Sequence, residues 1–346
     1  MGRCHETNSG VRMIKIADDI YILEVPTRFG IKINVSIFIT EAGIDTIDIG
    51  PNDNAALDEL QRGFQAINLN VKDIKNIYLT HAHEDHSGLS VYFHNNYGTC
   101  VHINELDGIF YDFNRDNMQK LLINVGNNLI KFGVQGQSKN DIISYVSDDF
   151  PIHQNKFNGF SSLNNIKVTT IGNYIAQVIH APGHTPGSTC FYLKKDKLLF
   201  SGDTILPRIT PNPGTIVLME MMSKNMKCEQ NPLKDFINSL QIIKNISANT
   251  LIPGHGYIIS MTDKLVDRYI RHHERTLNNI VDILGSNSLT CFELSKFIYR
   301  KIGNYDLLLQ ILEVEAHLRY LISLGKIQKI ENGEDPFLYR VQNISS

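Results

Sequence analysis

The residues most capable of metal binding or catalysis lie in one short segment, residues 80–88. This segment reads Thr-His-Ala-His-Glu-Asp-His-Ser-Gly and follows a strand-like run. Because alternate residues of an extended chain point to the same side, His81 and His83 would project together. Asp85 and His86 would lie on the turn that follows. One loop at the end of a strand can therefore offer ligands to two neighbouring metal ions.

Three later segments each place one polar residue on a tight turn after a strand-like run. They centre on His184 in Ala-Pro-Gly-His-Thr-Pro-Gly-Ser, on Asp203 in Phe-Ser-Gly-Asp-Thr, and on His255 in Ile-Pro-Gly-His-Gly. Glycine and proline let the backbone turn sharply, so a single side chain can point back over the strand ends. A lone histidine or aspartate after a strand is more often a cap or a surface turn, but together the four segments indicate one metal centre.

The ligand types indicate which metal and which chemistry to expect. Neutral imidazoles with carboxylates and no thiolate suit Zn2+, with Fe2+ or Mn2+ as substitutes. Two ions about 3.5–4 Å apart would share a water, lower its pKa and hold a carbonyl or phosphoryl oxygen of the substrate. Attack by the bridging hydroxide is the expected step. Asp85, a ligand through one oxygen, would guide the proton with its other oxygen.

In these motifs the chain resembles the metallo-β-lactamase superfamily, from about residue 14 to residue 261. The first motif of that superfamily matches Ile-Asp-Ile-Gly at residues 47–50. The resemblance implies that one ion is bound by His81, His83 and His184. It implies that a second ion is bound by Asp85, His86 and His255, and that Asp203 bridges the two ions. It also implies that Asp48 is a buried carboxylate that orients a ligand histidine, the alternative being an ordinary turn residue. Asp85 and Asp203 would carry the catalytic roles.

The resemblance also implies an α/β fold, the four-layer αββα sandwich, and the pattern along the chain agrees with it. Short β-branched runs occupy the first 49 residues. Residues 54–66 carry Leu57, Leu60 and Phe64 at helical spacing, which is typical of a core face. A second strand-rich half spans residues 166–203. Two sheets between helices, with the metal loops along one edge, are therefore predicted.

A helical insertion over about residues 105–157 interrupts this pattern. Its apolar series, which includes Phe110 and Phe113, is too rich for a simple surface helix. Because the insertion stands between the first histidine loop and His184, we expect a lid with an apolar underside that holds an acyl chain. The alternative is helical packing against the sandwich or a dimer contact.

Two domains are predicted: a metallo-β-lactamase domain over residues 1–262, which includes the insertion, and a C-terminal domain over residues 263–346. In the second, helices over 263–284 and about 307–323 are followed by two strands around Asn332-Gly333. This order resembles a winged helix.

The charge balance of the C-terminal domain bears on its partners. From Arg268 to the end it has ten Lys or Arg and nine Asp or Glu. Nucleic acid is therefore an open but not a favoured partner, and a packing or dimerising role is preferred, so a homodimer is among the expected assemblies. The charged run over residues 268–275 is expected to form a solvated helix face.

Composition sets the remaining limits. The 346 residues are 42% hydrophobic and 20% charged, with a net charge of −3 and no long basic run. The first ten residues lack the apolar core of a signal peptide, and no apolar stretch is long enough to cross a bilayer. The five scattered cysteines indicate reduced thiols. A cytoplasmic protein without membrane association is expected.

Two enzymatic functions remain open. The apolar insertion and the lack of basic excess favour hydrolysis of acyl thioesters or related acyl substrates, small or bound to a carrier protein. The alternative is a single-strand-specific endoribonuclease of the lactamase-beta-like group, which this arrangement also resembles and which would need a positive track to the metals. The candidate cations for that track are Arg208, Lys224, Lys227 and Arg271. Lactone opening is disfavoured, because the lactonase branch uses a tyrosine where this chain has Ile205 and Leu206.

Overall fold

The protein forms two compact units in a computed structural model. The first unit holds residues 1–114, 151–211 and 244–262, and the second holds residues 115–150, 212–243 and 263–346. The residues that the structure describes are 3–6, 11–28, 30–112, 118–148, 157–222, 231–260, 263–299, 304–331, 333 and 335–342.

The first unit contains a sheet with the strand order β1-β2-β3-β4-β5-β6-β7-β8. The strands are β1 Arg3–Glu6, β2 Arg12–Ala17, β3 Ile20–Pro26, β4 Lys32–Thr40, β5 Gly43–Ile47, β6 Ile74–Tyr78, β7 Cys100–Ile103 and β8 Phe160–Ser162. Neighbouring strands are antiparallel up to β5 and parallel from β5 to β8. The carboxyl ends of β5, β6 and β7 therefore meet at one edge of the sheet.

A second sheet in the same unit has the order β14-β13-β12-β11-β10-β9. The strands are β9 Val168–Ile171, β10 Tyr174–His180, β11 Thr189–Leu193, β12 Leu198–Gly202, β13 Thr250–Pro253 and β14 Ile259–Ser260. β12 and β13 are parallel, so their carboxyl ends also lie side by side.

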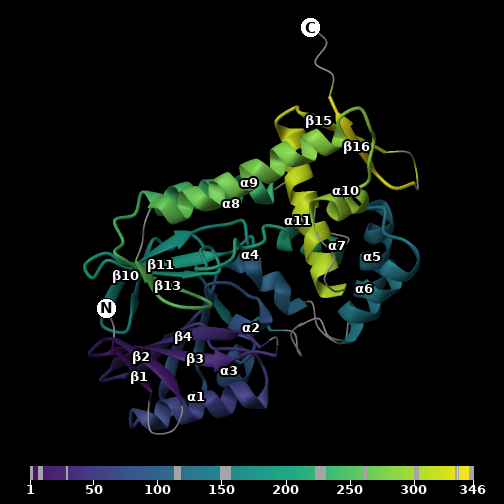
Figure 1. Ribbon diagram of the computed structural model, residues 1–346. Helices are drawn as coiled ribbons and strands as arrows, with labels where there is room; N and C mark the ends of the chain where they lie inside the picture. Colours follow the sequence, from purple (N-terminus) through teal and green to yellow (C-terminus); the bar gives the residue numbers. More distant parts are fainter. Residues whose placement is uncertain are drawn as a thin grey trace. The chain divides into compact units, whose positions relative to one another are not determined.

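Two apolar cores hold this unit together. The first sheet packs on the second through Ile22 and Phe38 on one side and Phe191 and Phe200 on the other, with the rings of Phe38 and Phe200 5.4 Å apart. The opposite face of the first sheet buries Leu23 and its neighbours against helices. Because adjacent strand residues point to opposite faces, Ile22 and Leu23 serve the two different cores. Figure 1 shows α1 across the outer face of β3 and β4, with the second sheet on their other side.

The helices of the first unit are short except for α1. They are α1 Asn54–Ala66, η1 Val71–Asp73, α2 Glu84–Ser87, α3 Ser90–Tyr97, α4 Glu105–Gly108 and η2 Ile109–Asp112. The helix predicted over 54–66 is confirmed, and Asp53 caps it by accepting a hydrogen bond from the backbone N of Ala56 at 2.7 Å. Leu60 and Phe64 are fully buried, as their spacing predicts.

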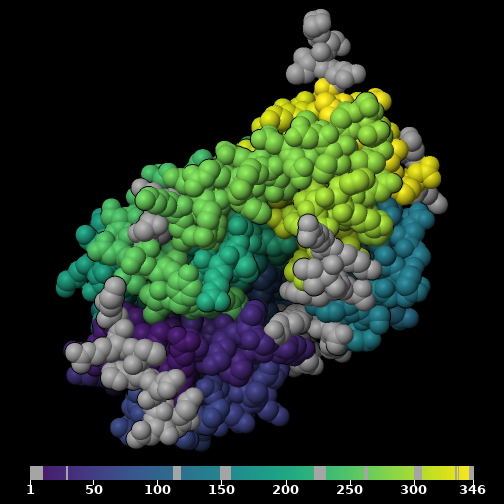
Figure 2. Space-filling model, in the orientation of Figure 1, coloured from purple at the N-terminus to yellow at the C-terminus, as the bar shows by residue number. Residues whose placement is uncertain are grey.

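The second unit is mainly helical. Its elements are α5 Met118–Lys131, α6 Gly136–Asp148, α7 Thr215–Met222, α8 Pro232–Lys244, α9 Asp263–Leu284, α10 Cys291–Ile298, α11 Asn304–Ser323, β15 Ile327–Ile330 and β16 Leu338–Val341. α5 packs on α6 and α7, and α11 contacts α6, α7, α9 and α10. The side chains of α9, light green in Figure 2, form a continuous ridge on the face shown.

The insertion is helical where the structure describes it, as predicted, but α5 and α6 join the second unit rather than the first. Leu121, Val125 and Leu129 of α5 are buried. The contacts of α5 with α6 and α7 account for this burial, and α6 in turn packs on α11. The compact units therefore differ from the division at residue 263 that the sequence suggests.

The C-terminal elements follow the expected order of helices and a two-stranded antiparallel sheet. The hydroxyl of Tyr339 on β16 donates a 2.8 Å hydrogen bond to Glu315, which fixes the hairpin to α11. The winged-helix assignment stays a prediction. Within the described parts of the chain, no helix is both long enough and apolar enough to cross a membrane.

Candidate metal centre

The seven residues predicted as metal ligands come together where strands of both sheets end. His81, His83, Asp85 and His86 follow β6, and His184 lies on the connection between β10 and β11. The remaining two follow the parallel strands of the second sheet: Asp203 follows β12, and His255 comes two residues after β13. Residues as far apart in the sequence as His81 and His255, which are 174 positions apart, thus meet at one edge of the sandwich.

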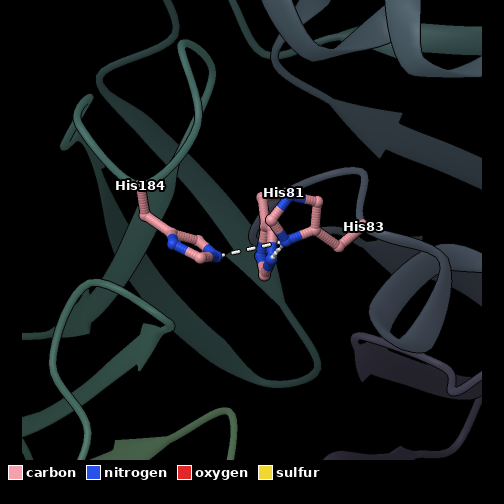
Figure 3. A group of neighbouring side chains, drawn as sticks. All are labelled: His81, His83 and His184. Carbon is pink, nitrogen blue, oxygen red and sulfur yellow. Dashed lines mark hydrogen bonds between the residues drawn. The ribbon is translucent and has the colours of Figure 1, made fainter. Parts of the chain in front are cut away.

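Three histidines form the first group. Nε2 of His81 lies 2.9 Å from Nδ1 of His83, which is 3.1 Å from Nε2 of His184 (Figure 3). Burial, followed by the neighbouring imidazoles, lowers the pKa of His83 to about 3 and that of His81 well below its usual value. These rings are therefore neutral, so their lone pairs are available to a cation.

The second group combines histidines with a carboxylate. Nε2 of His255 lies 3.2 Å from Nε2 of His86 and 3.2 Å from Oδ2 of Asp85. Burial alone would lower the pKa of His255, but Asp203 and Asp85 outweigh burial and raise it to about 9. This side of the centre is thus electronegative, and a positive charge is stabilised on it.

Asp203 stands between the two groups. Its Oδ1 lies 3.4 Å from Nε2 of His86, and its Oδ2 lies 3.6 Å from Nε2 of His255 and 3.7 Å from Nε2 of His184. Although Oδ1 is buried, it accepts no hydrogen bond from any residue that the structure describes. A carboxylate in this position can reach ligands of both groups, as a bridging residue must.

The donor set fits divalent metal ions. Ring nitrogens face one another at 2.9–3.2 Å, a separation at which two lone pairs repel unless a proton or a cation lies near them. Ligand atoms of His81, His83 and His184 all lie within 4.8 Å of one another, and so do those of Asp85, His86 and His255. Imidazole nitrogens with carboxylate oxygens are ligands that zinc accepts.

Asp48 holds His86 from behind, as expected of an orienting carboxylate. Its Oδ2 lies 2.9 Å from Nδ1 of His86, and its Oδ1 accepts a 2.8 Å hydrogen bond from the backbone N of Thr80. The backbone of Asp48 has φ 59°, a left-handed conformation that aspartate tolerates better than most residues. The bond to Nδ1 leaves Nε2 of His86 pointing at the centre.

A glycine and an asparagine fix the loop of His255. A Cβ at Gly254 would collide with Asp203 and His86, so only glycine lets the chain pass this close. The side chain of Asn34 on β4 donates hydrogen bonds of 2.9 Å to the carbonyls of Pro253 and Gly256. The first sheet thereby holds a loop of the second sheet.

Asp107 is a site residue that the sequence analysis missed, because it counted this residue only within the helical insertion. Asp107 is fully buried and accepts hydrogen bonds from the backbone N of Ala82 at 3.0 Å, the hydroxyl of Thr185 at 2.7 Å and the backbone N of Gly187 at 2.6 Å. Burial raises the pKa of Asp107 to about 6, although these hydrogen bonds act against the shift. Its place shortly after the parallel strand β7 was the available signal.

The other residues singled out in the sequence have different outcomes. The ring of Phe110 packs edge-on against the ring of His83, with 5.4 Å between centroids. Phe113, Lys224 and Lys227 lie outside the described residues.

A sandwich of two sheets with this donor set at its strand ends defines a metal-binding α/β protein. Comparison with protein-family models matches residues 34–255 to the Metallo-beta-lactamase superfamily. The chain therefore belongs to the metallo-β-lactamase superfamily, and the predicted α/β fold class is confirmed.

Curated relatives and solved structures agree with this assignment. The chain is 23% identical over 317 residues to the "Probable metallo-hydrolase YqjP" of Bacillus subtilis, with 88% of this chain and 92% of that protein covered. It is 24% identical over 109 residues to the "Atrochrysone carboxyl ACP thioesterase" of Aspergillus fumigatus, a match that covers 32% and 29% of the two chains. A metallo-beta-lactamase family protein of Thermus thermophilus superposes with a TM-score of 0.78 at 22% identity, covering 94% of this chain and all of that one.

Proposed function

We propose that this protein is a metal-dependent hydrolase that acts on acyl thioesters or related acyl substrates and uses two zinc ions. The observation that carries the acyl preference is the contact of Phe110 with His83, because it puts an aromatic surface next to a ligand of the centre. Aromatic rings supply large apolar contact area, which suits an alkyl or polyketide chain better than a phosphate backbone.

Further apolar side chains lie close in sequence to the ligands. Tyr257 comes two residues after His255 and is 48% exposed. Ile31 is 51% exposed and precedes Lys32, whose carbonyl is 2.8 Å from Nδ1 of His255. Exposed apolar residues next to a polar centre support a substrate that is polar at the reacting group and apolar beyond it.

The ligands determine what the site would do with such a substrate. Zinc ions at this site, when bound, would lower the pKa of water and polarise a carbonyl oxygen. Asp203 would contact both groups of ligands and keep them at a fixed distance from each other. Asp85 faces His255 with Oδ2, and its second oxygen would accept a proton from a nucleophilic water. The neutral rings of the first group bring no positive charge of their own.

The relatives support hydrolysis at different levels of detail. The Bacillus subtilis relative, which spans most of both chains, has a name that refers to a metallo-hydrolase. The Aspergillus fumigatus relative has a name that refers to a thioesterase acting on an acyl carrier protein, and its match covers about a third of this chain. Thioester hydrolysis is thus the more specific part of the proposal.

A side-by-side assay of the zinc-loaded protein tests the proposal. Acetyl and long-chain acyl thioesters and a single-stranded RNA are offered at equal enzyme concentration, and free thiol and RNA fragments are measured. We expect release of thiol from the acyl substrates. The Asp203→Ala variant should lose this activity by several orders of magnitude while keeping its circular dichroism spectrum. Cleavage of RNA without thioester hydrolysis would replace the proposal with the endoribonuclease alternative.

A further inference from the structure

A second group of histidines lies in the second unit, apart from the metal centre. His272 and His273 are neighbours on α9, and Glu313 and His317 are one turn apart on α11. One ligand atom each of His272, His273 and Glu313 lies within 4.8 Å of the other two. Nδ1 of His273 is 3.1 Å from Nε2 of His317. Four residues with metal-binding side chains thus meet where two helices pack.

The cluster is buried at one end and open at the other. His273 and His317 are both fully buried, whereas the side chains of His272 and Glu313 are 39% and 17% exposed. An ion could therefore enter from solvent past His272 and Glu313 and reach the buried rings. Nε2 of His272 already lies 3.8 Å from the Glu313 carboxylate.

Hydrogen bonding fixes the tautomer of His317. Its Nδ1 lies 2.7 Å from the backbone carbonyl of Glu313, and because a carbonyl only accepts, Nδ1 carries the proton. In a neutral imidazole only one ring nitrogen carries a proton, so the proton on Nδ1 leaves Nε2 of His317 without one. Nε2 of His317 therefore presents a lone pair to His273.

Neither tautomer of His273 satisfies the buried nitrogens. If its Nδ1 donates to His317, its Nε2 keeps a lone pair, and Nε2 has no hydrogen-bond partner among the described residues. If Nε2 carries the proton instead, two lone pairs face each other at 3.1 Å. Buried polar groups without partners are rare and costly, and a cation near the facing lone pairs would relieve the second arrangement.

The same pattern occurs in the metal centre. There, ring nitrogens approach one another at 2.9–3.2 Å, and Nδ1 of His255 points to the backbone carbonyl of Lys32 at 2.8 Å. His317 repeats both features, with Nε2 facing another imidazole and Nδ1 facing a carbonyl. Metal-bound histidines usually donate their second ring N–H in this way.

We propose that His272, His273, Glu313 and His317 form a separate site for a divalent metal ion, with zinc as the best match, that joins α9 to α11. Three imidazoles and one carboxylate supply four ligands, the number found in closed structural zinc sites. When protein ligands fill all four coordination positions, no position is left for a substrate. We therefore assign this site a role in the stability of the second unit rather than in hydrolysis.

Metal counting on the full-length protein tests this site. The wild type and the His272→Ala/Glu313→Gln variant are dialysed against equal concentrations of free Zn2+, and bound zinc per chain is measured by elemental analysis. We expect the variant to bind one ion fewer. The difference between the two proteins is the test, so the result does not depend on how many ions the metal centre holds or on what it hydrolyses. Glu274→Gln, which changes an exposed carboxylate on the same helix, is the matched control and should bind as the wild type does.

A second measurement guards against misfolding of the double variant. In a background with His83→Ala, Asp203→Ala and His255→Ala, Co2+ titration should still give the absorption bands of one tetrahedral ion, and Glu313→Gln added to that background should weaken binding at least tenfold. Equal zinc content in the wild type and the double variant, or no tetrahedral cobalt signal in the background protein, would overturn the proposal. The histidines would then form only a hydrogen-bonded pair in the core.

Discussion

The carboxylate of Asp107 accepts a 2.6 Å hydrogen bond from the backbone N of Gly187, and so links the insertion to the loop that carries His184. Its second oxygen accepts a hydrogen bond from the backbone N of Ala82, between His81 and His83. One buried side chain therefore sets the distance between the two loops that supply the first group of histidines. A Cβ at Gly187 would come within 2.7 Å of this carboxylate, which explains the glycine there.

Replacement of Asp107 by Asn should weaken metal binding at the first group. In the wild type both carboxylate oxygens of Asp107 accept hydrogen bonds from backbone N–H groups. The NH2 group of an amide would face at least one of these N–H groups and could not accept its hydrogen bond, so the two loops lose part of their alignment. Losses of about 10–100-fold in metal affinity are typical when such supporting residues change. Competition titration with a chromophoric chelator measures the effect. Glu105→Gln, an exposed carboxylate of the same segment, is the control. Unchanged affinity in Asp107→Asn would show that the loops hold their positions without it.

Asp48→Asn should act on the other group of ligands. The carboxylate at 2.9 Å from Nδ1 of His86 fixes which nitrogen of that ring faces the centre. The amide can do this only in one orientation and polarises the ring less, so we expect about 10–100-fold weaker binding of the ion held by Asp85, His86 and His255. Co2+ spectra distinguish the weaker ion from the other. Asp45→Asn on β5, the strand that Asp48 follows, serves as control, and equal loss of both ions would contradict a selective role.

The ligand residues could be predicted from the sequence, the distant ones His184, Asp203 and His255 through the family resemblance, but the contacts that support them could not. The spacing of His81, His83, Asp85 and His86 follows from the geometry of one strand and one turn, which is encoded within six residues. Asp107 and Gly187 are 80 residues apart, and their contact depends on how β7 and the β10–β11 connection meet. Apart from its place shortly after β7, nothing in the sequence around Asp107 distinguishes it from a helix-capping or surface carboxylate.

The same limit explains the errors outside the site. The charged run on α9 predicts a solvated face, and this is wrong for His273, which is fully buried against α11. The apolar series of the insertion correctly indicates helices with a buried face. It does not identify their partners, because α7 lies about 90 residues beyond α5 and α11 lies about 170 residues beyond α6. Periodicity shows that a face is buried but not what buries it.

In the metal-free protein, the buried imidazole of His273 should make stability fall with decreasing pH. His317, His272 and Glu313 surround this ring, and burial followed by the two neighbouring imidazoles lowers its pKa to about 2. The unfolded chain therefore takes up a proton near pH 6.5 that the folded chain does not, so stability is complete above that pH and decreases below it. One such group costs about 1.4 kcal/mol for each pH unit below 6.5.

Urea unfolding at pH 7.0 and 5.5 in the presence of chelator measures this dependence. The wild type should lose stability between the two pH values, and His273→Leu should lose less by about 1 kcal/mol, because the leucine side chain does not titrate. Taking the difference between the two proteins removes the contribution of the histidines in the metal centre. Identical losses would mean that His273 takes up its proton in the folded state as easily as in the unfolded chain.

Phe110 should govern the preference for chain length if the substrate is an acyl thioester. Each methylene that packs on an apolar surface contributes about 0.8 kcal/mol, which is roughly a fourfold gain in kcat/KM for each added methylene. Phe110→Ala removes the ring beside His83, so the increase of kcat/KM from acetyl to long-chain substrates should become shallower, while the acetyl thioester is nearly unaffected. Ile175→Ala, at a site 73% exposed on β10, is the control and should keep the wild-type dependence. Equal losses on short and long substrates would instead show that Phe110 only supports the position of His83, and the acyl contact would have to be sought elsewhere in the insertion.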